Sequence, residues 1–526
     1  MLVDKIKNFL LLLLFGSMFT VVFAFAGLKL ISARRNIPIN HAANFAWQNS
    51  ITNWPLDLQL AMAAALICGL IITTLLFWLL YNTKWTFQPR RIDDEESIKK
   101  LLSMSATKEE ARVFAGKYNE KEMYVSTEDR GLVIGPPGTG KTVFLLNQIL
   151  RAAEIGLSFA AIDIKPEIHK VISSGLVKNG YRVLKVNPAV DDPEADHWNP
   201  LADIDGETDI SELCNSLLPI NSPDEAPFVE AQRDWLKASV FHAKLQPGGS
   251  LPSAYQFLSS QPDFGKLLDV LIDSKSSTAA QIARRIKAGL SGNKPDPLIL
   301  PGLSGCLRSL NYLSLPGVQS ALGHSDFSIK EIGTSRPTAL FLQFEESKLG
   351  ALGPLLAFMA TGLLTSLINT AGKRAAVAFF LDEIGNMPAV PGLAEKLNTI
   401  RSRQLPTWMY FQTTQQIERR YGKGALDVFF ASSDAQLFFR LNDEKTRELV
   451  SRLIGTTEQV KTTQSTTREE GGRKTTISRT RERVAVIEPH ALGQLKPGQV
   501  VCLYRGAAAL GRATPHYVDF PEFKRS

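Results

Sequence analysis

Residues 131–142 read GLVIGPPGTGKT, and this stretch decides the fold. Three consecutive aliphatic residues, Leu132 to Ile134, predict a short strand that is buried on both faces. The next eight residues fit the phosphate-loop pattern G-x-x-x-x-G-K-[ST] in full, and residues 143–153 predict a helix directly after them. The stretch therefore predicts the strand, loop and helix of an α/β protein that binds a nucleoside triphosphate. The loop consists of Gly135, Pro136, Pro137, Gly138, Thr139, Gly140, Lys141 and Thr142.

The residue types of the loop indicate what it would hold. Glycines allow backbone N–H groups to wrap a phosphate at the amino end of a helix, where the helix dipole favours anions. Lys141 would reach the β- and γ-phosphates of ATP, and the Thr142 hydroxyl would ligate Mg²⁺. The alternative is a glycine-rich turn without a ligand, but such a turn needs neither the strand before it nor the helix after it. We therefore expect ATP and Mg²⁺ as ligands.

A second strand supplies carboxylates. Residues 376–388 read AVAFFLDEIGNMP, in which a buried strand, Ala376 to Leu381, ends in Asp382 and Glu383. Asp382 would hold Mg²⁺ through water, and Glu383 would polarise the water that attacks the γ-phosphate. Acidic residues often follow apolar runs, so this assignment depends on the phosphate loop. The adjacent Asp-Glu pair favours an enzyme that hydrolyses ATP over a protein that only binds it.

The spacing of the two motifs predicts an insertion. Lys141 and Asp382 lie 241 residues apart (382 − 141), much further than in a compact AAA+ module. Strand patterns at Phe159 to Ile164 and Arg182 to Val186 continue the α/β fold, with a helix between them. From residue 206 to 326 the apolar residues recur at helical spacing, separated by Pro, Gly and Ser. We predict an all-α domain there.

Strands and helices then alternate to the end of the chain. The predicted fold class is α/β: a RecA-like P-loop nucleotide-binding domain in two parts, 92–205 and 327–526, with the all-α domain of 206–326 inserted between them. The strands expected in the second part are 338–344, 376–381, 407–412, 435–441, 484–487 and 500–504, and the helices are 355–370, 393–403, 424–432 and 443–453.

Two apolar runs near the beginning of the chain predict a transmembrane anchor at residues 1–91. Only Lys29 is charged between residues 9 and 31, and no residue is charged between 60 and 80. Each run is close to the ~20 residues that a helix needs to cross the hydrocarbon core. A cleaved signal peptide is the alternative for the first run, which is long for one and is not followed by a clean A-x-A site before Arg34.

The orientation of the anchor follows from its basic residues and from the ATP site. Lysines before the first span and basic residues after the second favour both ends inside, whereas Arg34 and Arg35 in the loop 32–59 favour the reverse. Because ATP is cytoplasmic, we predict a multi-pass membrane protein with both termini cytoplasmic and the loop 32–59 on the opposite side of the membrane. The basic residues outside the spans are Lys5, Lys7, Lys84, Arg90 and Arg91.

The composition excludes several other classes of protein. The 526 residues are 44% apolar and 21% charged, which excludes a wholly disordered chain and a collagen-like chain. The net charge of +7 permits contact with nucleic acid or anionic lipid without requiring either. Four widely spaced cysteines, with no C-x-x-C pair, indicate neither a disulfide scaffold nor a zinc site.

Together with these motifs, several further stretches resemble one family, the type IV coupling proteins of bacterial conjugation and type IV secretion. The resemblance runs in order along nearly the whole chain. It implies a homo-hexameric inner-membrane ATPase that receives a relaxase-bound single strand of DNA and passes it to a secretion channel. The stretches are IDIKPE at 162–167, NPL at 199–201, LDEIGNMP at 381–388, IRSR at 400–403, FQTTQQIERRYG at 411–422 and AQLFFRLNDEKTRELVSRLIG at 435–455.

The resemblance also implies roles for residues outside the two motifs. Arg401 lies where the family places an arginine that reaches the γ-phosphate of the neighbouring subunit, and Arg403 is a close rival for this role. Gln412 ends a predicted strand where related ATPases carry a polar sensor of the γ-phosphate. The alternatives are a solvated basic turn for the arginines and an ordinary strand-end glutamine.

The implied partners are single-stranded DNA and the relaxase of a relaxosome, the inner-membrane components of a type IV secretion system, and membrane lipid. Residues 461–483 hold seven basic and three acidic side chains in a Thr/Ser/Gly-rich stretch. We expect a mobile loop or a β-hairpin there, which could contact DNA phosphates, a partner protein or only water.

Three other functions share some of these sequence features. A membrane-anchored AAA+ protease needs H-E-x-x-H, which the seven histidines do not form. A chromosome-segregation DNA pump of the FtsK type has more spans and a C-terminal winged helix, for which the stretch after Gly506 is too short. A receptor ATPase that passes protein substrates and does not translocate DNA stays open as the alternative.

Overall fold

The computed structural model describes residues 112–220, 222–261, 263–291, 294–469 and 472–523, and isolated positions between 29 and 67. The predicted spans at 9–31 and 60–80 and the loop at 32–59 lie almost wholly outside the described residues. Contacts divide the chain into two units, Met1–Gln88 and Pro89–Ser526, and the second unit holds the nucleotide motifs.

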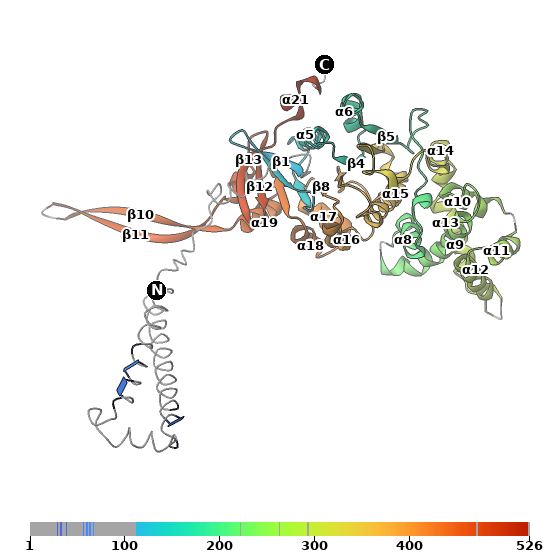
Figure 1. Ribbon diagram of the computed structural model, residues 1–526, viewed down its shortest axis with the longest axis horizontal. Helices are drawn as coiled ribbons and strands as arrows, with labels where there is room; N and C mark the ends of the chain where they lie inside the picture. The colour runs from blue at the N-terminus through green and yellow to red at the C-terminus, as the bar shows by residue number, and fades with distance from the viewer. Residues whose placement is uncertain are drawn as a thin grey trace. The chain divides into compact units, whose positions relative to one another are not determined.

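One sheet of eleven strands, in the order β2-β1-β13-β12-β9-β3-β8-β7-β4-β6-β5, organises the second unit (Figure 1). Every pair from β9 to β5 is parallel, and every pair from β9 to β2 is antiparallel. The strands are β1 Arg112–Tyr118, β2 Lys121–Ser126, β3 Gly131–Ile134, β4 Ser158–Asp163, β5 Arg182–Val186, β6 Thr338–Gln343, β7 Val377–Leu381, β8 Thr407–Phe411, β9 Ala435–Phe438, β12 Gln499–Tyr504 and β13 Ala507–Arg512.

The α/β prediction is confirmed by the parallel part of this sheet, but three strands at its antiparallel end were missed. These are β1, β2 and β13, which extend the sheet beyond β12. All residues of β3, β4, β6, β7 and β8 are buried, because helices cover both faces of the parallel part.

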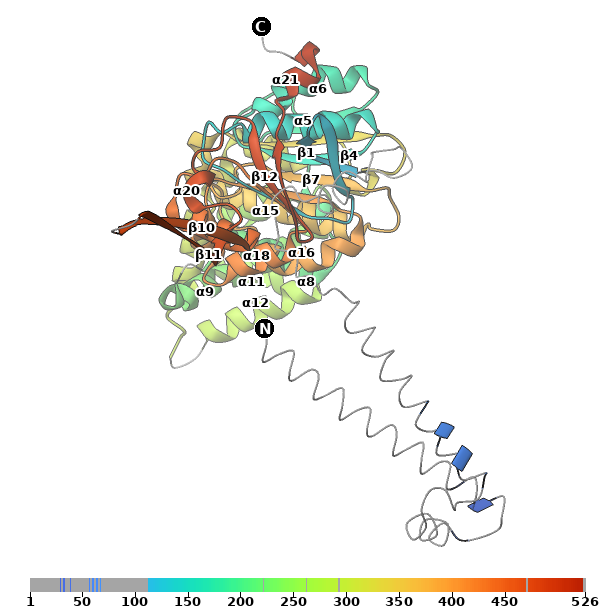
Figure 2. The ribbon, with the colours of Figure 1, turned by 90° about the vertical axis from the view of Figure 1, so that its left-hand side faces the viewer.

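Helices from different parts of the chain cover the two faces (Figure 2). On one face α5 (Lys141–Glu154) and α6 (Glu167–Lys178) pack through side chains such as Phe144 and Ile168, which are fully buried. On the other face lie α15 (Leu349–Asn369), α16 (Leu393–Ile400), α17 (Thr414–Tyr421) and α18 (Ala425–Ser432).

Helix α15 is the most apolar of these. Within the part of the chain that the structure describes, Glu346–Asn369 forms a helical segment that is long enough and apolar enough to cross a membrane. However, 83% of its most apolar window is buried inside the protein. Leu356, Phe358 and Leu363 are fully buried in the same cluster as Leu132 and Ile134 of β3. Its apolar surface therefore forms the core beneath the sheet.

Between β5 and β6 the described residues form helices and no strand, which agrees with the helical pattern of 206–326. Trp235 lies at the centre of this region, where its Nε1 donates a hydrogen bond to the carbonyl of Ile299 over 2.8 Å. One hydrophobic cluster contains both Trp235 and Leu356 of α15, so these helices share a core with the sheet. The helices are α7 Pro200–Asp203, α8 Glu207–Leu217, α9 Ala226–Lys244, α10 Leu251–Ser260, α11 Phe264–Ile272, α12 Ser277–Leu290, α13 Ile299–Ser309 and α14 Pro316–Gly323.

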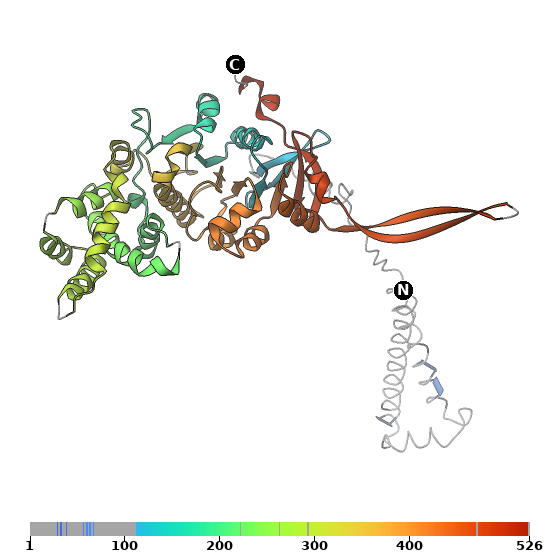
Figure 3. The same ribbon diagram turned by 180° about the vertical axis from the view of Figure 1, so that it is seen from behind.

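The basic stretch near residue 470 forms a long β-hairpin (Figure 3). Strands β10 (Thr456–Glu469) and β11 (Gly472–Ala485) pair antiparallel from Thr456↔Ala485 to Glu469↔Gly472. A mobile loop or a β-hairpin was expected for this stretch, and the hairpin is correct. The separate strand predicted at 484–487 is wrong, because β11 ends at Ala485 and pairs with β10 instead of joining the large sheet.

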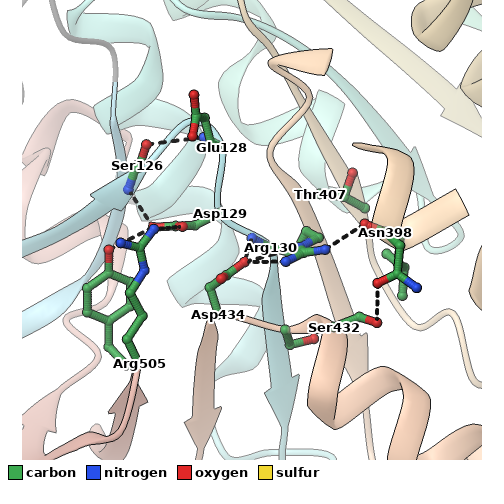
Figure 4. Close-up of polar contacts among 12 residues, drawn as sticks. Ser126, Glu128, Asp129, Arg130, Asn398, Thr407, Ser432, Asp434 and Arg505 are labelled. Carbon is green, nitrogen blue, oxygen red and sulfur yellow. Dashed lines mark hydrogen bonds and ion pairs between the residues drawn. The ribbon is translucent and has the colours of Figure 1, made fainter. Parts of the chain in front are cut away.

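Ion pairs fasten the amino end of β3 to its neighbours (Figure 4). The Arg130 guanidinium lies 2.8 Å from Asp434, directly before β9, and also donates to the carbonyl of Leu397 in α16 over 2.7 Å. Asp129 accepts hydrogen bonds from Tyr504 (2.8 Å) and Arg505 (2.6 Å) at the end of β12. These buried or half-buried contacts fix the strand that leads into the phosphate loop.

Candidate nucleotide-binding site

The phosphate loop connects the carboxyl end of β3 to α5, and its glycines are required by the backbone. Gly138 and Gly140 have φ angles of +77° and +101°, in the left-handed region that favours glycine. A Cβ atom on Gly135 would lie 2.7 Å from Cβ of Phe439 and 2.9 Å from Oγ1 of Thr139. Gly140 is the residue before α5, so the loop delivers the chain directly to a helix amino terminus. This is the geometry that presents backbone N–H groups to an anion.

Lys141 begins α5, and its side chain is only 4% exposed. Its ammonium donates to the carbonyl of Gly135 at 2.5 Å and to that of Pro136 at 3.3 Å, and it lies 3.9 Å from Glu383 Oε1. Burial lowers the pKa of Lys141, and the nearby carboxylates Glu383 and Asp382 oppose that change. The phosphate loop and the two carboxylates are far apart in the sequence, and the fold brings both close to the ammonium of Lys141.

Asp382 follows β7, which is separated from β3 only by β8. Burial, and secondly the neighbouring Glu383, raise the pKa of Asp382 to about 7. Its Oδ1 atom is buried and accepts no hydrogen bond from the residues that the structure describes. A buried carboxylate oxygen without a donor is costly unless a cation or a proton satisfies it. Oxygen ligands are what Mg²⁺ prefers, so Asp382 and the half-buried Thr142 fit this ion.

Glu383 is held in a strained conformation. Its φ angle of +50° lies in the left-handed region, which few non-glycine residues adopt and which costs conformational energy. Its Oε2 accepts hydrogen bonds from Gln412 Nε2 (2.7 Å) and from Asn386 Nδ2 (3.2 Å). Gln412 follows β8, the strand beside β7, so two neighbouring strands determine where this carboxylate points.

A second layer of amides, which the sequence did not single out, supports this arrangement. Gln416 of α17 donates to Asn386 Oδ1 over 3.2 Å and accepts the backbone N–H of Gln412 over 2.8 Å. Arg420 of the same helix donates to the carbonyl of Gly385 over 3.0 Å. Both Asn386 and Gln416 lie inside quoted motifs, but nothing in a linear motif shows which amide the carboxylate uses.

The two candidate arginines lie apart from this network. The helix predicted at 393–403 ends at Ile400, and a single 3₁₀ turn, Arg401–Arg403, follows it before Gln404 adopts φ +49°. Both arginines are exposed, and neither guanidinium makes a hydrogen bond or ion pair with a described residue. The structure of one chain therefore does not join them to Lys141.

A pocket of about 280 Å³ opens beside Thr142 at the amino end of α5. Its wall combines aliphatic side chains with polar groups from α6 and from α21 (His516–Asp519), which suits a flat base and a ribose next to a phosphate site. The lining residues are Thr142, Val143, Leu146, Glu167, Val171, His516 and Tyr517.

Comparison with known proteins gives one family. The family model described as "Type IV secretory system Conjugative DNA transfer" matches residues 81–525. Protein VirD4 of Rhizobium rhizogenes is 22% identical over 339 residues, which are 62% of this chain and 49% of that protein. VirD4 of Agrobacterium fabrum gives the same identity over 62% of this chain and 50% of that protein. The chain thus spans about half the length of these curated relatives.

Solved structures share the fold. The bacterial conjugative coupling protein TrwBdeltaN70 superposes with a TM-score of 0.63 at 19% identity, covering 81% of this chain and 94% of that chain. The plasmid coupling protein TrwB in complex with ADP and Mg²⁺ gives a TM-score of 0.63 at 18% identity, covering 82% of this chain and 94% of that chain. At this identity the likeness shows the fold alone.

Proposed function

The chain belongs to the type IV secretory system family for conjugative DNA transfer, and we propose that it is the ATP-hydrolysing coupling protein of such a system. In this proposal it recruits relaxase-bound single-stranded DNA and drives it toward the secretion channel. The observation that carries the enzymatic part is Glu383, whose backbone is strained and whose carboxylate lies 3.9 Å from Lys141 and accepts hydrogen bonds from the side-chain amides of Gln412 and Asn386.

The described residues support a division of roles in hydrolysis. Backbone N–H groups of the phosphate loop and Lys141 would bind the β- and γ-phosphates, and Thr142 and Asp382 would hold Mg²⁺. The cation, when bound, neutralises negative charge on the phosphate oxygens. Glu383 would orient the attacking water and accept its proton, while Gln412 and Asn386 keep the carboxylate in position. TrwB structures described as complexes with ADP and Mg²⁺ and with a non-hydrolysable ATP analogue support these ligands.

We propose a ring assembly because Arg401 and Arg403 are exposed and lie outside the network of their own chain. An arginine supplied to a neighbour's γ-phosphate needs subunits packed side by side, and closed rings are the usual solution for identical chains. A homo-hexamer is the assembly that the resemblance implies. Separate substitutions of Arg401 and Arg403 would show which of the two acts on the neighbouring subunit.

The remaining parts of the proposal concern location and partners. Residues 1–91 would anchor the protein in the inner membrane through spans at about 9–31 and 60–80, with both termini cytoplasmic and residues 32–59 periplasmic. The nucleotide-binding domain would comprise 92–205 and 327–526, and the helices of 206–326 would form the inserted domain. Lipid, the relaxosome and inner-membrane secretion components would be its contacts.

The test is the ATPase rate of the full-length protein in detergent, measured without DNA and with single- or double-stranded DNA. We expect Mg²⁺-dependent hydrolysis that single-stranded DNA stimulates. Lys141→Ala should abolish hydrolysis, because the ammonium that binds the phosphates is removed. A near wild-type rate in this variant would defeat the assignment of the loop. If neither form of DNA changes the ATPase rate but a secreted protein raises it, the transported substrate is protein and not DNA.

A further inference from the structure

Two histidines and an aspartate meet where the chain leaves the sheet for the helical region and where it returns. His197 lies between β5 and α7, and His324 and Asp326 follow α14. His197 Nδ1 lies 2.6 Å from Asp326 Oδ2, and His324 Nε2 lies 3.5 Å from Asp326 Oδ1. The two imidazole rings stack with centroids 4.2 Å apart and planes at 27°. One ligand atom from each of the three residues lies within 4.8 Å of the others.

The spacing of these atoms is close to that of a metal site. Ligand atoms at about 2.0–2.2 Å from a tetrahedral ion lie roughly 3.3–3.6 Å from one another. The distance of 3.5 Å from His324 Nε2 to Asp326 Oδ1 is close to this value, and the distance of 2.6 Å from His197 Nδ1 to the other oxygen, Oδ2, is shorter. Every pair among the three ligand atoms lies within 4.8 Å. The His324 side chain is 62% exposed and stacks on the His197 ring. Its neighbour His197 is only 27% exposed and is already oriented.

A supporting hydrogen bond selects the ligand atom of His197. Its Nε2 lies 3.1 Å from the hydroxyl of Ser320, which leaves Nδ1 facing Asp326. Metal-bound histidines typically donate their other ring N–H to an oxygen in this way. Two imidazole nitrogens and one carboxylate oxygen suit Zn²⁺ and its neighbours among the transition metals, whereas Mg²⁺ and Ca²⁺ prefer oxygen ligands. Three protein ligands leave a fourth position for water.

Backbone hydrogen bonds of the same residues already join the segment before α7 to the segment after α14. The backbone N–H of His197 donates to Asp326 Oδ2 over 2.9 Å, and the N–H of Asp326 donates to the carbonyl of His197 over 3.0 Å. Next to them, the N–H of Asn199 donates to Ser325 Oγ over 2.9 Å. A metal bound here would add a cross-link at the base of the helical region.

We propose that His197, His324 and Asp326 form a binding site for a divalent transition-metal ion of the Zn²⁺ class, which fastens the helical region to the sheet. His197 lies 127 positions before His324 (324 − 197), so no short cysteine or histidine motif in the sequence indicates the three residues together.

The test uses full-length protein in detergent, purified with a tag that contains no histidine and stripped with EDTA. Co²⁺ is titrated while visible absorption is recorded, because tetrahedral Co²⁺ absorbs strongly and octahedral Co²⁺ at a phosphate site absorbs weakly; Zn²⁺ then competes. The variants are His324→Ala and Asp326→Asn. The matched control is His490→Ala, which removes an exposed histidine on α20 (Pro489–Leu492).

We expect one equivalent of strongly absorbing Co²⁺, displaced by Zn²⁺, in the wild type and in His490→Ala. Both site variants should bind it at least tenfold more weakly, and the melting temperature should rise by a few degrees with Zn²⁺ only where the site is intact. His324 contributes little to folding because it is mostly exposed. If Asp326→Asn misfolds, the Co²⁺ affinity of His324→Ala alone therefore tests the site. Unchanged binding in His324→Ala, or no tetrahedral absorption in the wild type, overturns the proposal.

Discussion

Gln412→Ala tests whether the amide beside β8 positions Glu383 for hydrolysis. In the wild type, Gln412 Nε2 donates to Glu383 Oε2 over 2.7 Å, the shorter of the two side-chain hydrogen bonds to this carboxylate. The variant removes this donor and leaves Asn386, 3.2 Å away. The carboxylate should then lose its fixed direction toward the attacking water, while the phosphate loop, which we propose binds ATP, stays intact.

The size of the effect follows from the type of hydrogen bond. A hydrogen bond to a charged group contributes about 1.5–3 kcal/mol. Because each 1.36 kcal/mol is a factor of ten in rate, complete loss of that energy from the transition state would slow hydrolysis by about 10- to 150-fold. Asn386 retains part of the restraint, so we expect a 10- to 50-fold decrease in kcat, with ATP affinity changed by less than about threefold.

The assay is single-turnover phosphate release at saturating ATP, combined with equilibrium binding of a fluorescent ATP analogue. Gln415→Ala is the matched control, because Gln415 lies three residues after Gln412, in the first turn of α17, and donates to Asp443 over 2.9 Å. The control should stay within about twofold of the wild-type rate. If Gln412→Ala hydrolyses ATP at the wild-type rate, or if Gln415→Ala loses as much activity, the positioning argument is wrong.

Other substitutions test the remaining roles. Glu383→Gln should bind ATP but hydrolyse it at least a hundredfold more slowly in the same two assays; loss of ATP binding would instead make Glu383 a metal ligand. Asp382 has a pKa of about 7 in the folded protein, above its ordinary 3.8, so its stabilising contribution is complete below about pH 4 and is lost as the pH rises to 7. Asp382→Asn should therefore melt at a higher temperature than the wild type at pH 8 without nucleotide, not at pH 4, and should not hydrolyse ATP; equal melting temperatures at pH 8 would contradict the burial argument. Arg401→Ala and Lys141→Ala should each be inactive alone and recover partial ATPase activity when mixed, since some interfaces then pair an intact arginine with an intact loop. If mixed rings proven by crosslinking stay inactive, Arg403 is the next variant to test.

The parts of the fold that could be predicted depend on short, local patterns. The phosphate loop fixes β3 and α5 because the motif requires a strand before it and a helix after it. The strands β4, β6, β7 and β8 are continuous apolar runs, since both of their faces are buried. Such runs are recognisable without knowledge of their neighbours.

The strands that were missed lack such a pattern. Strand β13, AAALGR, is rich in alanine, which has low strand propensity, and pairs with β1 and β12 in the sheet. In β1, the pairing with β2 shifts register between Phe114 and Gly116, where a bulge with φ +120° at the glycine interrupts the alternation. Tertiary pairing forms these strands, and no local signal reveals it.

The same distinction applies to the site. Lys141, Asp382 and Glu383 were identified from motifs, and the structure brings them together. The amides around Glu383 and the cluster at His197 depend on which loops meet in space, and a single sequence does not contain that information. The end of the helix before Arg401 was placed three residues too late, because IRSR has no residue that stops a helix and the turn is completed by Gln404 in a left-handed conformation.

The nucleotide site and the exposed arginines are connected through one set of hydrogen-bonded elements. The hydrogen bonds of Glu383 lead through Asn386 and Gln416 to α17. Helix α17 packs on α18, and Ser432 of α18 donates to Asn398 of α16 over 3.1 Å (Figure 4).

Arg130, the residue directly before β3, donates a hydrogen bond to the carbonyl of Leu397 in α16. Helix α16 ends at Ile400, directly before Arg401. Loss of the γ-phosphate removes the charge that Lys141 and Glu383 face, so any rearrangement of this carboxylate acts on elements that carry the arginine of the same chain. In the proposed ring that arginine serves the next subunit. We therefore expect hydrolysis at one site of the proposed ring to alter the next site through α16.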